Sequence, residues 1–151
     1  MEEVVARKAF FSFHYGRDIS RANVVRKSWV TKDQGTAGFI DASLWEEAKA
    51  KGDAAIKRLI DDQMMGTTVT AVLIGSETAQ RTYVNYEIAK SIERGNGIFG
   101  IYIQNIRDLN GNTAPKGANP LAAGYSTYDW VSGNGYANLG TWVEAAYQAA
   151  H

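Results

Sequence analysis

Three short apolar runs, each of strand length, constrain the fold of this chain most strongly. Thr68–Ile74 is the clearest of them, and Ala9–Phe13 and Ile98–Ile103 are similar in length and character. Continuous apolar runs of this length are typical of strands that are buried on both faces, as in a parallel sheet. Two weaker segments, Ala37–Ile40 and Tyr125–Val131, are expected to add a second and a last strand.

The segments between these strands show helical periodicity, and the alternation of strand and helix predicts an α/β fold. Strands joined through helices run parallel, so we expect a single doubly wound, five-stranded parallel sheet with helices on both faces, flavodoxin-like in outline. The chain has 151 residues, enough for one domain with a proper core, and it shows no internal repeat or linker. Residues 1–151 are therefore expected to form a single domain.

Caps and apolar stripes place the expected helices. Asp18, Asp53 and Asn138 are each positioned to cap a helix, and a further helix after the strand at 68–74 is expected to end at Gly95. The stripes expected to face inward are Ala22, Val25 and Trp29; Ile56, Leu59, Ile60 and Gln63 or Met64; and Leu139, Trp142, Ala146 and Ala150.

Two segments are expected to lack regular structure. Asp41–Gly52 shows no clear periodicity, and Gln104–Gly124 is a long loop rich in Gly, Asn and Pro. Within this loop, Asp108–Asn112 begins like a calcium-binding loop, but Thr113 stands where that loop needs glycine and Asn119 where it needs glutamate. We interpret the run as a turn.

Composition excludes several classes of function. Sixteen basic residues balance sixteen acidic ones, so the chain has no electrostatic footprint for nonspecific nucleic-acid binding. It has no cysteine and two histidines, which excludes disulfides and cysteine-based metal sites, and we expect no metal site. No apolar run approaches the ~20 residues of a membrane span, and the acidic start does not resemble a secretory signal. We therefore expect a cytoplasmic protein without a membrane partner.

Common nucleotide-binding motifs are missing from the sequence. The turn after the first strand, Ser12–Arg17, has one glycine and cannot form a Gly-x-Gly-x-x-Gly dinucleotide turn, and no Gly-Lys-Ser/Thr phosphate loop occurs. His14-Tyr15 and Gly75-Ser76 stand where a two-component receiver needs acidic residues. Arg17 and Arg21, near a helix start, could bind phosphate or form solvated ion pairs, and the sequence favours neither.

An acid and several aromatic residues are expected at the carboxyl edge of the sheet, where open α/β proteins bind ligands. Glu87 follows Tyr83 by one helical turn, so the two side chains are expected to share a face. The first strand and its loop, Phe10–Tyr15, bring further polar and aromatic groups to the same edge. Together these residues suggest a nucleotide site with a catalytic acid.

Such a site suits the cleavage of a nicotinamide N-glycosidic bond. The reaction passes through an oxocarbenium-like ribose, which one carboxylate can stabilise while aromatic faces stack on the base. Nicotinamide leaves as a neutral base, so no strong general acid is needed. One glutamate, without cysteine or metal, is sufficient for this chemistry.

Each candidate also has an ordinary structural interpretation. Glu87 could be a solvent-facing helical residue paired with Lys90, and His14 could be a packed loop histidine. Tyr83 could be a core or rim aromatic, and Trp45 could be either a packing residue or part of a pocket wall.

Several separated motifs carry a resemblance to a known family. They are Lys8-Ala-Phe-Phe-Ser-Phe-His-Tyr15; Arg21-Ala-Asn-Val-Val-Arg26 with Trp29-Val30; Gly75-Ser-Glu-Thr78; Arg81-Thr-Tyr-Val-Asn-Tyr-Glu-Ile88; and Gly100-Ile-Tyr-Ile103. In this order, and over most of the chain, they resemble the TIR-like domain of the Thoeris antiphage family, in its ThsB-type proteins. TIR enzymes often carry Trp-Cys where this sequence has Tyr83-Val84, a departure that ThsB-type proteins tend to share.

The resemblance implies a TIR-like enzyme that cleaves NAD as its substrate, without a further cofactor, and makes a cyclised ADP-ribose-type signal for a separate effector protein. It implies a response to phage infection and, because TIR enzymes commonly act as assemblies, it allows a homo-oligomer. Glu87 is the implied catalytic residue. The implied substrate-binding residues are Phe11, Ser12, Phe13, His14, Tyr15, Ser76 and Tyr83.

Two other functions stay open from the sequence. One is a non-catalytic TIR-like module that binds a partner or senses a viral protein. The other is a nucleoside deoxyribosyltransferase-like enzyme, which shares this architecture and uses a glutamate nucleophile.

Overall fold

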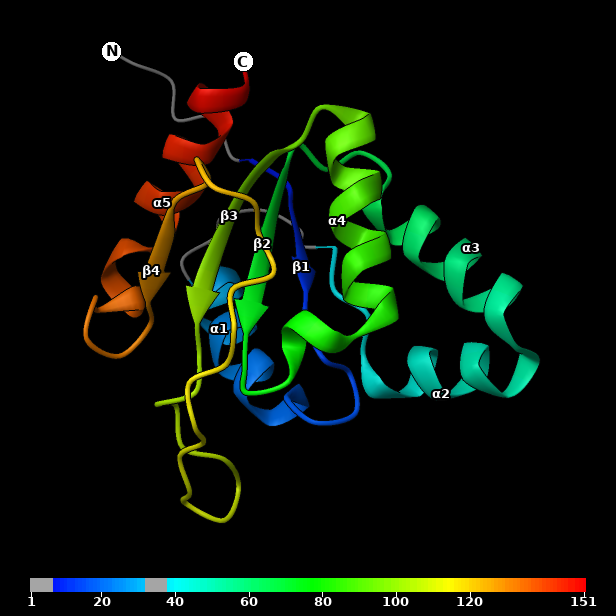
Figure 1. The fold of residues 1–151 in the computed structure, drawn as a ribbon, viewed down its shortest axis with the longest axis horizontal. Coiled ribbons are helices and arrows are strands. Elements are labelled where there is room, and N and C mark those ends of the chain that lie inside the picture. Colours follow the sequence, from blue (N-terminus) through cyan, green and yellow to red (C-terminus); the bar gives the residue numbers. More distant parts are fainter. Residues whose placement is uncertain (1–6, 32–37) are drawn as a thin grey trace.

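The computed structural model describes residues 7–31 and 38–151. In these residues four strands form a parallel sheet, and five α-helices pack around it (Figure 1). The strands are β1 (Ala9–Ser12), β2 (Val69–Ile74), β3 (Gly97–Tyr102) and β4 (Thr127–Asp129). The helices are α1 (Ile19–Thr31), α2 (Ala42–Lys51), α3 (Asp53–Met64), α4 (Thr82–Arg94) and α5 (Gly135–Ala150), with a 3-10 turn, η1 (Thr78–Gln80), before α4.

The strands lie in the order β1-β2-β3-β4, and each neighbouring pair is parallel. β2 and β3 pair along their full length, with Val69 opposite Gly97 and Ile74 opposite Tyr102. Every residue of β1 and β2 is buried, as expected for strands covered by helices on both faces. The predicted α/β fold with a parallel sheet is therefore confirmed.

The prediction of five strands is wrong, because the described residues form four. In the expected second strand, Ala37–Ile40, the first residue lies outside the described part of the chain, and Gly38 joins the sheet by an isolated parallel bridge to Phe10. Two backbone hydrogen bonds of 2.9 and 2.7 Å hold this bridge. Pairing stops there because Phe39 turns into the core and Asp41 then caps α2. The last strand is also shorter than expected.

The segment expected to be irregular, Asp41–Gly52, is mostly helical. α2 begins after Asp41, whose carboxylate accepts the backbone N–H of Leu44 at 2.9 Å. It ends at Gly52, whose φ of 107° lies in the region that glycine adopts without steric cost. α3 follows directly, and its cap is Gly52 rather than Asp53, which is its first helical residue. Because α2 is a helix, its residues four positions apart share a face.

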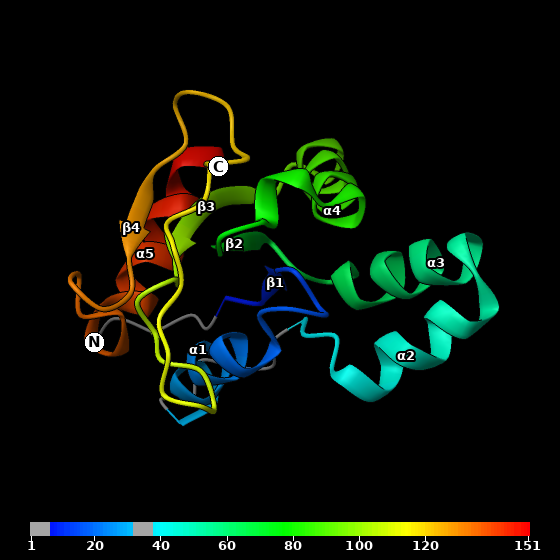
Figure 2. The ribbon, with the colours of Figure 1, turned by 60° about the horizontal axis from the view of Figure 1, so that its bottom comes forward.

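Helix α4 covers one face of the sheet, and α1 and α5 cover the other (Figures 1 and 2). Helices α2 and α3 lie side by side beyond β1, at the edge of the sheet (Figure 2). Most residues of the predicted stripes are buried: Ala22, Val25, Trp29, Ile56, Ile60, Met64, Leu139, Trp142 and Ala146. Ala150 is exposed at the end of α5, so its inward placement was wrong.

The last helix begins earlier than expected, at Gly135. Asn138 therefore lies inside its first turn, where its amide donates to the Gly133 carbonyl at 2.8 Å instead of capping the helix from outside. None of the helices in residues 7–31 and 38–151 has the length and apolar character needed to cross a membrane.

The long loop Gln104–Gly124 contains no helix or strand, as predicted, yet it is anchored to the core. The buried Arg21 donates through Nε to the Ile106 carbonyl at 2.7 Å and through Nη2 to the Asn112 carbonyl at 2.9 Å. Asp108 accepts two backbone N–H groups within the loop, each at 2.9 Å, which agrees with its interpretation as a turn. Arg21 also pairs with Asp18 at 3.5 Å, so of the two roles left open the ion pair is the one observed, although it is buried rather than solvated.

Candidate functional site

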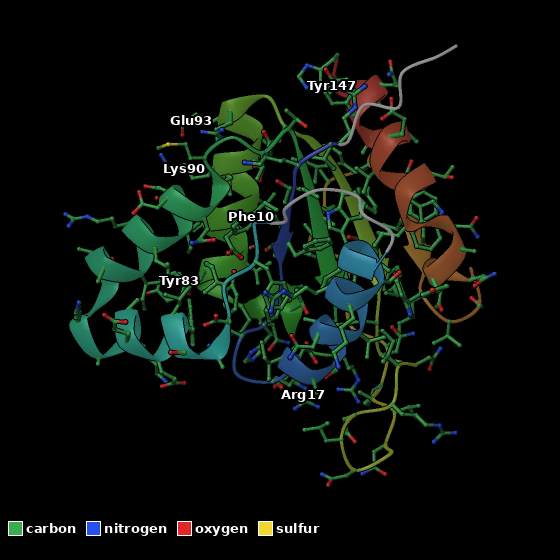
Figure 3. The ribbon with its side chains drawn as sticks, turned by 180° about the vertical axis from the view of Figure 1, so that it is seen from behind. Phe10, Arg17, Tyr83, Lys90, Glu93 and Tyr147 are labelled. Atoms are coloured by element: carbon green, nitrogen blue, oxygen red, sulfur yellow. The ribbon has the colours of Figure 1, made fainter. Side chains whose placement is uncertain are left out.

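Glu87 lies on the face of α4 that packs against the sheet, together with Val84, Ile88 and Ser91. Its side chain has 0% exposure, so it is a carboxylic acid enclosed by the core. Lys90, which a solvent-facing Glu87 could have paired with, instead contacts Glu93 at 3.7 Å toward the far end of α4 (Figure 3). The surface interpretation of Glu87 is therefore wrong.

Two hydroxyl groups, one from the last residue of β1 and one from the loop after it, hold the Glu87 carboxyl group. Ser12 Oγ donates to Oε1 at 2.7 Å, and the Tyr15 hydroxyl donates to Oε2 at 2.5 Å. Both contacts are buried, and both join residues more than seventy positions apart in the chain. Each carboxyl oxygen thus accepts one hydrogen bond in this arrangement.

Burial dominates the electrostatics of this cluster. It raises the pKa of Glu87 from 4.5 to about 8, against the opposing effect of the Ser12 and Tyr15 hydrogen bonds, which favour the charged form. Burial and the adjacent Glu87 also raise the pKa of the Tyr15 hydroxyl well above its usual 10. At neutral pH burial therefore favours the protonated acid, whose own O–H must then donate to the Ser12 or Tyr15 oxygen, so that one of the two hydrogen bonds is reversed.

A cavity of about 350 Å³ lies next to this cluster at the carboxyl edge of the sheet. Its walls come from the loop after β1, from α2 and the start of α3, and from the first turn of α4. Tyr15 lines it, whereas Glu87 does not, so the tyrosine contacts both the cavity and the acid. The acid is covered on the side that faces the cavity.

Aromatic rings form much of the cavity wall. Tyr15 stacks on Trp45 of α2 with ring centroids 4.3 Å apart, and its ring also lies 4.4 Å from that of Phe13. Trp45 meets Tyr83 of α4 edge to face at 5.6 Å. The Tyr83 hydroxyl donates to Asp53 at 2.7 Å. These side-chain contacts connect the loop after β1 with α2, α3 and α4.

His14 lines this cavity, and Arg17 follows it in the same loop before α1. Burial, and then the charge of Arg81, lower the pKa of His14 from 6.5, so the imidazole is neutral near pH 7. Its Nδ1 accepts the backbone N–H of Arg17 at 3.1 Å. Arg17 forms a 2.9 Å ion pair with Glu77 and donates to Ser76 at 2.8 Å, so of its two open roles the ion pair is the one observed.

The structure brings most of the sequence-predicted residues together. Ser12 and Tyr15 contact Glu87, and Phe13, His14 and Tyr83 line the cavity. Two others lie elsewhere. Phe11 points to the opposite face of the sheet, where its ring meets Trp29 and Phe39 at 6.2 and 6.5 Å. Ser76 does not line the cavity and is engaged by Arg17.

Lys49, Asp53 and Arg81 line the cavity but were not among the predicted site residues. Trp45, left open as packing or pocket wall, serves as both. The signal for Lys49 was its spacing of four from Trp45, which places both on one face once α2 is known to be a helix. The described residues contain no group of three or more His, Cys, Asp or Glu side chains arranged to hold a metal ion.

Comparison with known proteins matches this chain to one family. The family model described as Thoeris protein ThsB, TIR-like domain, matches residues 10–108, a range that includes every site residue named above. A curated protein of Bacillus cereus (strain MSX-D12), named "Putative cyclic ADP-D-ribose synthase ThsB1", is 50% identical over 141 aligned residues. That alignment covers 85% of this chain and 73% of the relative.

Proposed function

Because this chain belongs to the Thoeris ThsB family of TIR-like proteins, we propose that it is an NAD-cleaving enzyme of antiphage defence. It releases nicotinamide and makes a cyclic ADP-ribose-type signal that activates a separate effector protein. The similarity to a relative named as a cyclic ADP-D-ribose synthase supports the reaction, and the enclosed acid beside an aromatic cavity supports the site.

The observation that carries the proposal is the pair of hydroxyl groups on Glu87. Ser12 and Tyr15 donate to its two oxygens, one each, at 2.7 and 2.5 Å. The two hydroxyls of a ribose can make the same kind of contact with a carboxylate. We propose that a substrate hydroxyl replaces the Tyr15 hydroxyl on Oε2 and that Ser12 keeps the carboxyl group oriented through Oε1.

In the proposed reaction the bond between ribose C1′ and the nicotinamide nitrogen breaks, and its electron pair stays with nicotinamide. The positive charge that develops on C1′ and the ring oxygen is stabilised by the Glu87 carboxylate. A nucleophilic atom of the ADP-ribose unit then attacks C1′ and closes the ring, releasing a proton to solvent where that atom carries one. Attack by water would give linear ADP-ribose, so the aromatic wall favours the cyclic product by excluding water.

Glu87 must be ionised for this role, whereas burial in the present arrangement favours its protonated form. Movement of Tyr15 and entry of a polar substrate would reduce the desolvation that raises the pKa of Glu87. We therefore propose that the described arrangement is a resting one and that a phage-derived trigger, acting with or without self-assembly, opens it.

The same closed arrangement gives one reason to keep a second candidate. Glu87 is completely buried and the cavity does not reach it, which is also what a non-catalytic TIR-like interaction module would show. The two functions differ in turnover, so one experiment separates them.

We would compare nucleotides by mass spectrometry in cells expressing wild type, Glu87→Gln or Glu93→Gln, with and without phage challenge. Glu93 is the matched control, because it lies on the same helix but is exposed and paired with Lys90. An infection-dependent ADP-ribose-type product that needs Glu87 and not Glu93 is expected. Unchanged NAD with a stoichiometric partner complex would instead indicate the interaction module, and turnover of deoxynucleosides would indicate a deoxyribosyltransferase.

A further inference from the structure

The cavity beside Glu87 is lined by two cations that have no partner among the residues that the structure describes. Lys49 comes from α2, and Arg81 is the residue that precedes α4. Both are exposed, and within residues 7–31 and 38–151 neither side chain forms an ion pair or a hydrogen bond. Two elements far apart in the sequence thus present free positive charge to one concave surface.

Neighbouring cations are engaged differently. Lys51, two residues after Lys49 on the same helix, contacts Glu47 at 3.4 Å. Lys57 contacts Asp53 at 3.3 Å. The free state of Lys49 is therefore not general for the lysines of α2 and α3.

The two acidic residues of the cavity wall form no ion pair with Lys49 or Arg81 in the described part of the chain. Asp53 already accepts the Tyr83 hydroxyl at 2.7 Å and is paired with Lys57. Glu46 is the other carboxylate on the cavity wall, and it is exposed without an ion pair to Lys49 among the described contacts. His14 contributes no charge near pH 7, because burial and Arg81 lower its pKa. A ligand anion can therefore meet Lys49 and Arg81 without displacing an internal partner.

We propose that Lys49 and Arg81 bind the phosphate groups of the substrate and so select phosphorylated nucleotides over nucleosides. This inference rests on the proposed function and adds two specificity-determining residues to it. A cavity of about 350 Å³ is near the lower end of ligand-site volumes, so it holds part of a dinucleotide, with the phosphates near the exposed cations. Arginine supplies a planar set of donors that matches phosphate oxygens, and lysine supplies a compact point charge.

The test is calorimetric titration of ADP-ribose and of adenosine into Glu87→Gln protein, in which catalysis is removed. Lys49→Gln and Arg81→Gln are introduced singly into this background, with Lys51→Gln as the matched control from α2. Each cavity variant is expected to weaken ADP-ribose binding about tenfold to a hundredfold, the range for one charge-assisted hydrogen bond. Adenosine binding and the Lys51 control should be unchanged, and thermal unfolding checks that every variant is folded.

Either of two results in the ADP-ribose titrations alone would overturn the inference: ADP-ribose binding that the cavity variants leave unchanged, or no ADP-ribose binding at all at millimolar concentration. Equal weakening of adenosine and ADP-ribose would do so as well, because it would indicate a structural effect. In protein with Glu87 restored, Lys49→Gln and Arg81→Gln should raise KM for NAD and leave kcat within about twofold.

The outcomes also separate this inference from the proposed function. Cation-dependent ADP-ribose binding without NAD turnover in challenged cells would refute the enzyme and retain the phosphate site. NAD turnover that needs Glu87 but is unchanged in the Lys49→Gln and Arg81→Gln variants would support the enzyme and refute the phosphate site.

Discussion

Replacing Glu87 with glutamine should stabilise the protein, although it removes the proposed catalytic acid. The carboxyl group is completely buried and its pKa is raised from 4.5 to about 8. Glutamine has nearly the same shape and carries no charge at any pH. Its carbonyl can accept the Ser12 hydroxyl, and its amide can donate to the Tyr15 oxygen, so both buried contacts keep a partner.

The magnitude follows from proton linkage. Unfolded Glu87 ionises above pH 4.5, whereas the folded protein keeps the proton up to about pH 8. The folded state therefore binds more protons between these values, and the contribution of this group is full below pH 4.5 and lost as pH rises toward 8. Each pH unit in this window is worth about 1.4 kcal/mol, so wild type should lose roughly 3–4 kcal/mol relative to Glu87→Gln between pH 5 and pH 8.

Urea unfolding of both proteins at pH 5, 6.5 and 8 measures this difference, because titration of all other groups cancels when the two free energies are subtracted. We expect the variant's advantage in free energy of unfolding to grow steadily with pH. An advantage that changes by less than about 1 kcal/mol across this range would show that Glu87 is not held protonated by burial. A variant that is less stable at pH 8 would refute the reasoning entirely.

Two further perturbations test the cover over the acid and the packing of the sheet. Tyr15→Phe keeps the ring on its aromatic neighbours but removes the hydroxyl that occupies Oε2 of Glu87. We therefore expect NAD cleavage by unchallenged protein to rise about tenfold to a hundredfold in a nicotinamide-release assay. A fall in the rate would show that the hydroxyl assists catalysis. Gly97→Ala would place a Cβ 2.2 Å from the Ala146 carbonyl oxygen, so thermal unfolding should show a loss of about 1–3 kcal/mol. Gly16→Ala is its control, since the added Cβ meets only His14, at 3.5 Å, and equal losses would contradict the steric explanation.

The sequence predicted the buried centre of the sheet well, because a continuous apolar run such as Thr68–Ile74 can bury its side chains only where helices cover both faces of the sheet. The sequence did not predict helix α2, and the reason is physical. Only Trp45 and Ala48 of this ten-residue helix are buried, so no apolar stripe marks it. The cap at Asp41 and the glycine at position 52 were the signals that could have indicated a helix there.

The candidate site was likewise predicted from the sequence only in part. Glu87 could be selected from its place on the helix after β2, but its complete burial depends on Ser12 and Tyr15, which local periodicity cannot position. The alternation of side chains along β1 was a usable signal for Phe11. Neighbouring strand residues point to opposite faces, so Phe11 and Ser12 cannot both face α4.

The pairing of β1 with β2 has a consequence for how this protein is made. Ala9 pairs with Val69, sixty positions later, so β1 is synthesised long before its neighbouring strand, β2, exists. At roughly 5–20 residues per second, an emerging chain carries Ala9–Ser12 without β2 for about 3–12 s. During that interval Phe10 and Phe11, both completely buried in the finished fold, lack the cover that β2 later provides. The two hydroxyl groups that contact the acid, on Ser12 of β1 and on Tyr15 of the loop after it, are thus made well before the strand that completes their side of the sheet.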